Sequence, residues 1–78
     1  MTKDEFITKF RNQFDETEPD KIDFETMFKE LEEWSSMTAL IIIAMADEEY
    51  NFKLSGDDIR NSNTVQDLYD LIKIKSLT

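Results

Sequence analysis

Ser35 and Ser36 are the side chains of this sequence best placed to do chemistry. Serine hydroxyls favour helix N-termini, where they accept hydrogen bonds from free backbone N–H groups, and a helical pattern of apolar residues runs from Ser36 to about Tyr50. A phosphodiester attached to such a hydroxyl would lie at the positive end of that helix. An ordinary helix cap explains the same residues, and the local pattern alone leaves both interpretations open.

The rest of the chain lacks the groups that most enzymes use. Its 78 residues include no histidine and no cysteine, which removes the usual general base and the strongest nucleophile. A Ser-His-Asp arrangement is therefore impossible, and the single glycine cannot build a phosphate-binding glycine loop. We expect that the protein is not an enzyme.

One acidic stretch has part of the spacing of a calcium-binding loop. Asp47, Glu49 and Asn51 alternate as the first three ligands of an EF-hand do, and Asp58 stands where the last ligand belongs. Phe52, however, occupies the position at which that loop needs glycine for its sharp turn. We expect no metal site, because a solvated acidic helix end explains these residues.

The chain is strongly acidic, with 18 acidic and 9 basic residues and a net charge of −9. This charge disfavours contact with nucleic acid or anionic membranes, and it favours protein partners that present basic patches. Acidity for solubility alone is the alternative explanation. The N-terminal residues lack the apolar stretch of a signal peptide, and the longest apolar run, Ala39 to Ala46, is too short to span a bilayer. We expect a cytoplasmic protein.

The first half of the chain predicts one clear helix and a long connection. Phe6, Phe10 and Phe14 recur at helical spacing, and Thr2 or Asp4 is suited to cap the helix that they form. A run of acids with the only proline, residues 15–20, then indicates a turn. Helical spacing resumes inside this connection and predicts a short helix that contains Phe24, Met27, Phe28 and Leu31.

The second half predicts a long helix from Ser36 to Tyr50, a loop over 51–56, a short turn of helix over 57–61 and a final helix. Thr64 and Asp67 have the spacing of a capping box at the start of the final helix. That helix presents Val65, Leu68, Tyr69 and Ile72 on one face. Because no segment alternates as strands do, the whole chain, 1–78, is predicted to form one all-α domain.

A helical wheel divides the helix after Ser36 into two faces. The predicted core face consists of Ala39, Ile42, Ile43, Ala46 and Tyr50. The opposite face carries Met37, Ile41, Ala44 and Glu48. In a thin domain one side of this helix should face water, so we expect Met37 and Ile41, together with Met45, to form an exposed apolar strip. Such strips often mark contact surfaces, although burial of both faces under the preceding loop is the alternative.

Three segments, taken in order, resemble those of the acyl and peptidyl carrier proteins. The stretch from Trp34 to Leu40 is similar to the attachment motif of this family, in which Asp-Ser-Leu opens the second helix. The stretch from Ile41 to Tyr50 resembles that helix, with its acidic end and closing aromatic residue. The stretch from Thr64 to Ile72 looks like the last helix of the family, and the distance from Ser36 to Thr64 also suits it.

The resemblance implies a small four-helix bundle with a long loop between the first and second main helices. It implies that a phosphopantetheinyl transferase attaches the 4′-phosphopantetheine arm of coenzyme A to Ser36, with Ser35 as a minor alternative. The thiol of the arm would hold acyl or aminoacyl groups as thioesters for partner enzymes with basic and apolar docking patches, in fatty acid or secondary metabolite biosynthesis. We expect a monomer whose candidate partner contacts are Met37, Thr38, Ile41, Met45 and Glu48.

The chain departs from the family pattern at three places. Ser35 replaces the aspartate before the motif serine, and Met37 replaces the leucine after it, a change that conserves volume. The first turns of the helix carry Thr38 and Ile41 rather than acids, which favours a dedicated pathway with an apolar docking surface. The alternative function is an unmodified acidic adaptor with the same helical fold, which docks other proteins through the apolar strip.

Overall fold

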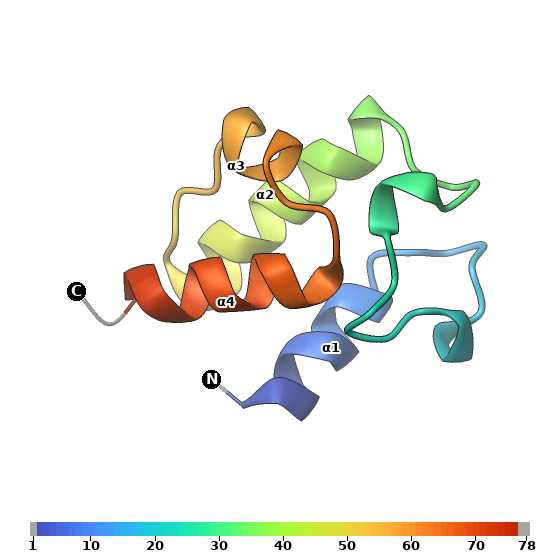
Figure 1. Ribbon diagram of the computed structural model, residues 1–78, viewed down its shortest axis with the longest axis horizontal. Coiled ribbons are helices and arrows are strands. Elements are labelled where there is room, and N and C mark those ends of the chain that lie inside the picture. The colour runs from blue at the N-terminus through green and yellow to red at the C-terminus, as the bar shows by residue number, and fades with distance from the viewer. Residues whose placement is uncertain (1, 77–78) are drawn as a thin grey trace.

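The computed structural model describes residues 2–76, and all regular elements within them are helical (Figure 1). The four α-helices are α1 (Lys3–Arg11), α2 (Ser36–Tyr50), α3 (Gly56–Arg60) and α4 (Val65–Ser76). Two single 3-10 turns, Pro19–Lys21 and Phe28–Glu30, lie between α1 and α2. The prediction of an all-α chain is confirmed, as is the expected start of the long helix at Ser36.

Helix α1 begins as its sequence predicts. The Thr2 hydroxyl accepts a hydrogen bond from the Glu5 N–H at 3.1 Å, so Thr2 rather than Asp4 is the cap. Phe6 and Phe10 are fully buried. The helix ends at Arg11, whose side chain turns back to donate to the Ile22 carbonyl at 2.7 Å and so holds the following connection against α1.

The connection over 12–35 does not contain the short helix that the sequence predicts around Phe28. Only one 3-10 turn forms there, because backbone carbonyls of this segment serve another helix. The carbonyls of Thr26 and Phe24 accept the N–H groups of Val65 and Gln66, at 3.2 and 2.9 Å. These N–H groups have no partner within α4 itself, so the connection caps the start of α4 instead of coiling into a helix.

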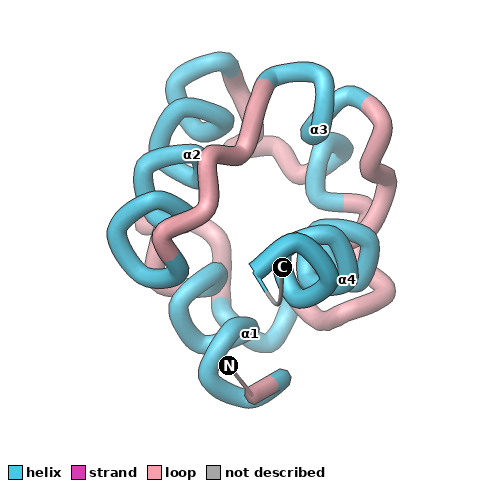
Figure 2. Tube along the Cα trace, turned by 90° about the vertical axis from the view of Figure 1, so that its left-hand side faces the viewer, coloured by secondary structure: helices cyan, strands magenta, loops and turns pink. Residues whose placement is uncertain are grey.

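The core is largely aromatic and includes side chains from the connection. Helices α1, α2 and α4 pack against one another in pairs, and Figure 2, which looks along α4, shows the other two beside it. The ring of Phe6 lies at its centre, 5.4 to 6.1 Å from the rings of Phe10, Tyr50 and Tyr69. Phe28 extends this core from the connection and packs edge-on against Phe10 and Trp34.

Capping residues fix the other helix ends. Asn51 ends α2 in the left-handed conformation, at φ 53°, and its N–H donates to the Asp47 carbonyl at 3.0 Å. Ser55 and Asp58 form a reciprocal capping box at the start of α3. The capping box predicted at Thr64 is also present, because the Thr64 N–H donates to the Asp67 carboxylate while the Thr64 hydroxyl accepts the Asp67 N–H.

Phe28→Ala should strongly destabilise the protein, although the residue belongs to no α-helix. Removal of a fully buried ring typically costs about 3–5 kcal/mol of unfolding free energy. The neighbouring Met27 is half-exposed, so Met27→Ala should cost less than about 0.5 kcal/mol. Urea denaturation of both variants tests the prediction. A loss for Phe28→Ala as small as that for Met27→Ala would contradict the contribution of the connection to the core.

Candidate functional site

The two serines have different roles at the start of α2. Ser35 is the N-cap, and its hydroxyl accepts a hydrogen bond from the Thr38 N–H at 3.3 Å. Ser36 is the first residue of the helix and is exposed. Its hydroxyl makes no hydrogen bond within residues 2–76. The interpretation of Ser36 as an ordinary cap is therefore wrong, since Ser35 has that role.

The hydroxyl of Ser35 is also engaged as a donor. The Thr38 hydroxyl donates its single proton to the Glu33 carbonyl at 2.8 Å. The 3.3 Å contact between the hydroxyls of Ser35 and Thr38 must therefore use the proton of Ser35. Ser35 thus holds two hydrogen bonds that any group attached to its oxygen would disturb, whereas Ser36 holds none.

Two of the expected partner contacts lie inside the molecule. Thr38 is buried, and its hydroxyl fixes the start of α2 through the bond to Glu33. Met45 is only 4% exposed. The expectation that Met45 belongs to an exposed strip is therefore wrong. The buried residues of α2 (Thr38, Ile42, Met45 and Ala46) are centred about 70° from the core face predicted on the helical wheel, at 100° per residue.

This rotation follows from what packs against α2. The helix faces α1 and α4, which bury the side that carries Met45 and leave Ala39 and Ile43 only partly buried. Met37, Ile41 and Glu48 are exposed as expected. The unbranched side chain of a methionine also fills irregular gaps in a core more readily than a branched one.

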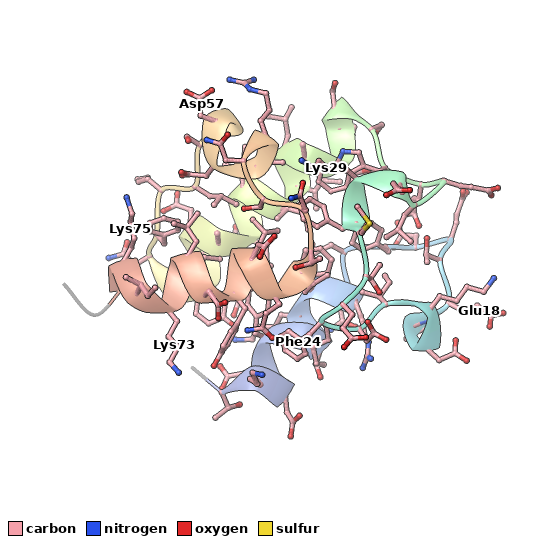
Figure 3. All side chains as sticks on the ribbon, viewed as in Figure 1. Glu18, Phe24, Lys29, Asp57, Lys73 and Lys75 are labelled. Carbon is pink, nitrogen blue, oxygen red and sulfur yellow. The ribbon has the colours of Figure 1, made fainter. Side chains whose placement is uncertain are left out.

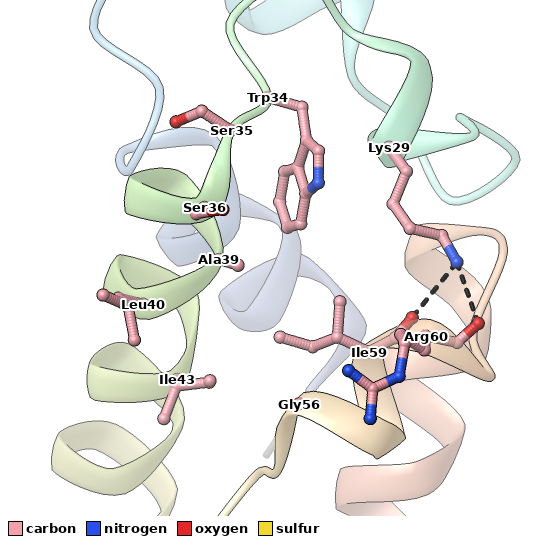
Figure 4. A pocket seen from close by; sticks show the side chains of 10 residues that line it. All are labelled: Lys29, Trp34, Ser35, Ser36, Ala39, Leu40, Ile43, Gly56, Ile59 and Arg60. Carbon is pink, nitrogen blue, oxygen red and sulfur yellow. Dashed lines mark hydrogen bonds between the residues drawn. The ribbon is translucent and has the colours of Figure 1, made fainter.

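Ala39 and Ile43 line an open groove between α2 and α3, with a volume of about 540 Å³ (Figure 4). Trp34 and Ile59 extend into the groove from opposite sides, and Ser36 lies on the α2 wall. The complete lining consists of Lys29, Trp34, Ser35, Ser36, Ala39, Leu40, Ile43, Gly56, Ile59 and Arg60. The groove is thus mainly apolar, and the exposed serine is one of its lining residues.

The charged residues among this lining, Lys29 and Arg60, are both basic, although the chain as a whole is acidic. The ammonium group of Lys29 donates to the carbonyls of Ile59 and Arg60, at 3.2 and 3.0 Å. It thereby bonds two carbonyls at the end of α3, of which that of Ile59 also accepts the Ser62 N–H, and holds α3 against the connection (Figure 4). Arg60 pairs with Asp57 at the outer end of α3, where Figure 3 labels Asp57.

The carboxylate of Glu33 joins the end of the connection to its beginning by hydrogen bonds. It accepts hydrogen bonds from the Thr17 hydroxyl at 2.7 Å and from the N–H groups of Asp15 and Glu16, at 2.9 and 3.0 Å. The hydrogen bond from Thr17, followed by those from the backbone, holds the pKa of the Glu33 carboxyl below its usual value. The carbonyl of the same residue anchors Thr38, so Glu33 joins the connection to the start of α2.

Comparison of the chain with protein-family models, curated proteins and solved structures finds no significant match. Within residues 2–76, no helix is long and apolar enough to cross a membrane, and no cluster of three or more potential ligand residues could hold a metal ion. The proposals below therefore rest on the geometry of this chain and on the motifs in its sequence.

The sequence pattern identified Ser36 but not the groove beside it. Lys29 lies in the connection that precedes the serine and Ile59 in a more distant segment after it, and nothing in their local pattern places either of them beside the groove. Leu40 was also missed as an exposed residue. Its position on the wheel, between Met37 and Ile43, would have identified it if the orientation of α2 had been known.

Substitution by alanine should separate the roles of the two serines. Ser35→Ala removes the cap and leaves the Thr38 N–H without its partner, so unfolding free energy should fall by about 1 kcal/mol. Ser36→Ala removes an exposed hydroxyl without hydrogen bonds and should change it by less than about 0.5 kcal/mol. Urea denaturation of both variants provides the measurement. A larger loss for Ser36→Ala would contradict the assigned roles.

Glu33→Gln should lower the melting temperature in a pH-dependent way. Because folding lowers the pKa of Glu33, its contribution to stability is complete above the usual pKa of a glutamate and is lost as pH falls through the lowered value. The difference in melting temperature between wild type and Glu33→Gln should therefore be largest near neutral pH and shrink in acid. The exposed neighbour Glu32 provides the matched control, since its carboxylate accepts none of the hydrogen bonds that Glu33 accepts. A difference for Glu33→Gln that does not vary with pH would refute this role.

Proposed function

We propose that the protein is a carrier protein that holds acyl or aminoacyl groups as thioesters on a phosphopantetheine arm attached to Ser36. One observation carries this proposal: Ser36 is exposed at the first turn of α2, its hydroxyl is free of hydrogen bonds within residues 2–76, and it lines an open apolar groove. The arm would supply the thiol that this cysteine-free chain lacks. The carrier itself would leave the chemistry of its cargo to partner enzymes.

The residues around Ser36 suit an attached phosphodiester. The N-terminus of α2 places the positive end of the helix dipole beside it, where negative charge is favoured. No acidic side chain occurs in the first turn of α2, and the groove carries the cations of Lys29 and Arg60. The apolar lining contributed by Trp34, Ala39 and Ile59 suits the uncharged part of an arm or a short apolar cargo.

Attachment would require one displacement at the Ser36 oxygen. Its oxygen forms a bond to the phosphorus next to the pantetheine half of coenzyme A, and the nucleotide half leaves with the electrons of the broken P–O bond. The serine proton passes to a base on the transferase, because no histidine of this chain is available for that purpose. The role of this protein would be to present the hydroxyl on the first turn of α2, which Ser35 and Thr38 hold in place.

The arrangement of helices supports the same proposal. A first helix, a long connection, a long helix that begins at the serine, a short third helix and a final helix follow one another in the order that the carrier-protein resemblance implies. The replacement of the motif aspartate by Ser35 also has a structural counterpart, because Ser35 caps α2 as an aspartate would. The cap is therefore retained although the charge is absent.

Intact mass after incubation with coenzyme A and a broad-specificity phosphopantetheinyl transferase tests the proposal. Wild type should gain the mass of one arm, Ser36→Ala should gain none, and Ser35→Ala should still gain one. A well-characterised carrier protein in the same reaction shows that the transferase is active.

Absence of modification in wild type, with the control carrier fully modified, would reject the carrier role for this transferase class. It would favour the unmodified adaptor, for which the exposed apolar residues of α2 would remain the working surface. Modification of Ser36→Ala but not of Ser35→Ala would move the attachment point to Ser35.

A further inference from the structure

Residues 15–17, early in the connection, are bonded to a residue that lies just before Ser35 and Ser36. Three of their donors bond to the carboxylate of Glu33, which follows them by 16 to 18 residues in the chain. The shortest of these bonds, from the Thr17 hydroxyl, measures 2.7 Å. Hydrogen bonds to a carboxylate are about twice as strong as those between neutral groups. This contact therefore ties two distant parts of the connection firmly together.

The contact requires a carboxylate at position 33, although charge opposes one there. Nine of the 18 acidic residues of the chain lie in 15–33, so the carboxylate of Glu33 is placed among like charges, which is unfavourable. It nevertheless offers two acceptor oxygens, and both are used. A glutamine would avoid the repulsion, but it has one acceptor oxygen and an NH₂ group that would face the donors. The three hydrogen bonds are thus the task that an acid serves at this position.

The first turn of α2 depends on the backbone of Glu33 as well as on its own cap. The Ser35 hydroxyl contacts the N–H and the hydroxyl of Thr38 at 3.3 Å in both cases, which is longer than the usual range of such bonds. By contrast, the Thr38 hydroxyl donates to the Glu33 carbonyl at 2.8 Å. Thr38 is buried, so water would not readily replace this bond. The turn therefore needs the carbonyl of Glu33 to stay in place.

We propose that Glu33 is a positioning residue for Ser36, and that residues 15–17 thereby control how Ser36 is presented. The carboxylate of Glu33 is held by these residues, and its carbonyl in turn holds Thr38. Ser36 makes no hydrogen bond of its own within residues 2–76, so the backbone around it sets its position. Without the contact, the first turn of α2 would open for part of the time, because the ends of helices open most easily.

Partial opening of this turn should act on KM rather than on kcat when Ser36 is modified. This consequence rests on the proposed function, whereas the effect on the turn does not. A transferase that binds only the presented conformation has an apparent affinity reduced by the population of that conformation. Once bound, the complex reacts at the same rate, so kcat is unchanged. A loss of overall stability in a protein that is still almost fully folded would change neither constant.

The first test measures kcat and KM for modification by the broad-specificity transferase with coenzyme A. Glu33→Gln should raise KM for this protein by about fivefold and leave kcat unchanged. Thr17→Val should raise KM by about threefold, because it removes one of the three bonds and no charge. The matched controls are Glu32→Gln and Thr8→Val. Both side chains are exposed and neither bonds to Glu33, so these changes should alter neither constant.

A double variant shows whether Thr17 and Glu33 act through one link. Effects of two residues in contact do not add as independent effects do. Thr17→Val combined with Glu33→Gln should therefore raise KM by about as much as Glu33→Gln alone, rather than by the product of about 15-fold. Urea denaturation of each variant confirms that it is folded under the conditions of the assay.

Backbone ¹⁵N relaxation of labelled protein tests the structural part without any modification. In Glu33→Gln and Thr17→Val, residues 35–38 should gain motion, measured as lower order parameters or as exchange on the μs–ms timescale. The middle of α2, around Ile43, should be unchanged, as should the whole of α2 in Glu32→Gln and Thr8→Val. If wild type is never modified but this motion appears, the carrier role is rejected and the positioning of Ser36 by Glu33 stands.

Two results would overturn the inference. Unchanged relaxation at residues 35–38 in both variants would mean that the packing of Trp34 against Phe28 fixes the start of α2 without Glu33. A higher KM for Glu33→Gln but not for Thr17→Val would mean that the transferase contacts the carboxylate itself, which would make Glu33 a binding residue.

Discussion

The site depends on a short chain of hydrogen bonds that fixes the start of α2. The Thr38 hydroxyl donates to the Glu33 carbonyl, the Ser35 hydroxyl donates to that of Thr38, and the Thr38 N–H returns to Ser35. A helix has free N–H groups at its first turn, and here the side-chain cap is made by Ser35, which accepts the N–H of Thr38, rather than by Ser36. The hydroxyl that faces solvent is free because its neighbours do the capping.

The long connection contributes side chains to the core and hydrogen bonds to the ends of two helices. A chain of this size without cysteine has little core to spare, and Phe28 and Ile22 supply fully buried side chains from the connection. The connection also accepts two N–H groups from the start of α4, holds the end of α3 through Lys29, and is closed by Glu33. Glu33 joins two parts of the connection, whereas Lys29 ties it to the end of α3, so the groove beside Ser36 has a fixed wall on the α3 side.

Local signals predicted most of the helices, because capping and periodicity depend on neighbours in sequence. The caps at Thr2 and Thr64 and the start of α2 at Ser36 belong to this class. The short helix expected around Phe28 did not form, since its carbonyls bond to α4, a contact that no local pattern encodes. The burial of Met45 was missed for a related reason. Residues 36–46 of α2 carry no charge, so every side of this part is compatible with the core, and only the packing of α1 and α4 determines which side is buried.

That ambiguity is informative about function. A sequence that needed only to fold could have placed charges on the outer side of α2 and thereby specified its orientation. This chain instead keeps Met37, Leu40 and Ile41 in water, where an apolar surface brings no stability to the isolated protein and increases the risk of aggregation. The high net negative charge offsets that risk by keeping copies apart. Ser36 begins this helix, with the groove on one side of it and the exposed side chains of Met37, Leu40 and Ile41 on the other. On the proposed function, a group attached there would rest in the groove while the exposed side of α2 stays open to a partner protein, so that storage and delivery would use different faces of the same helix.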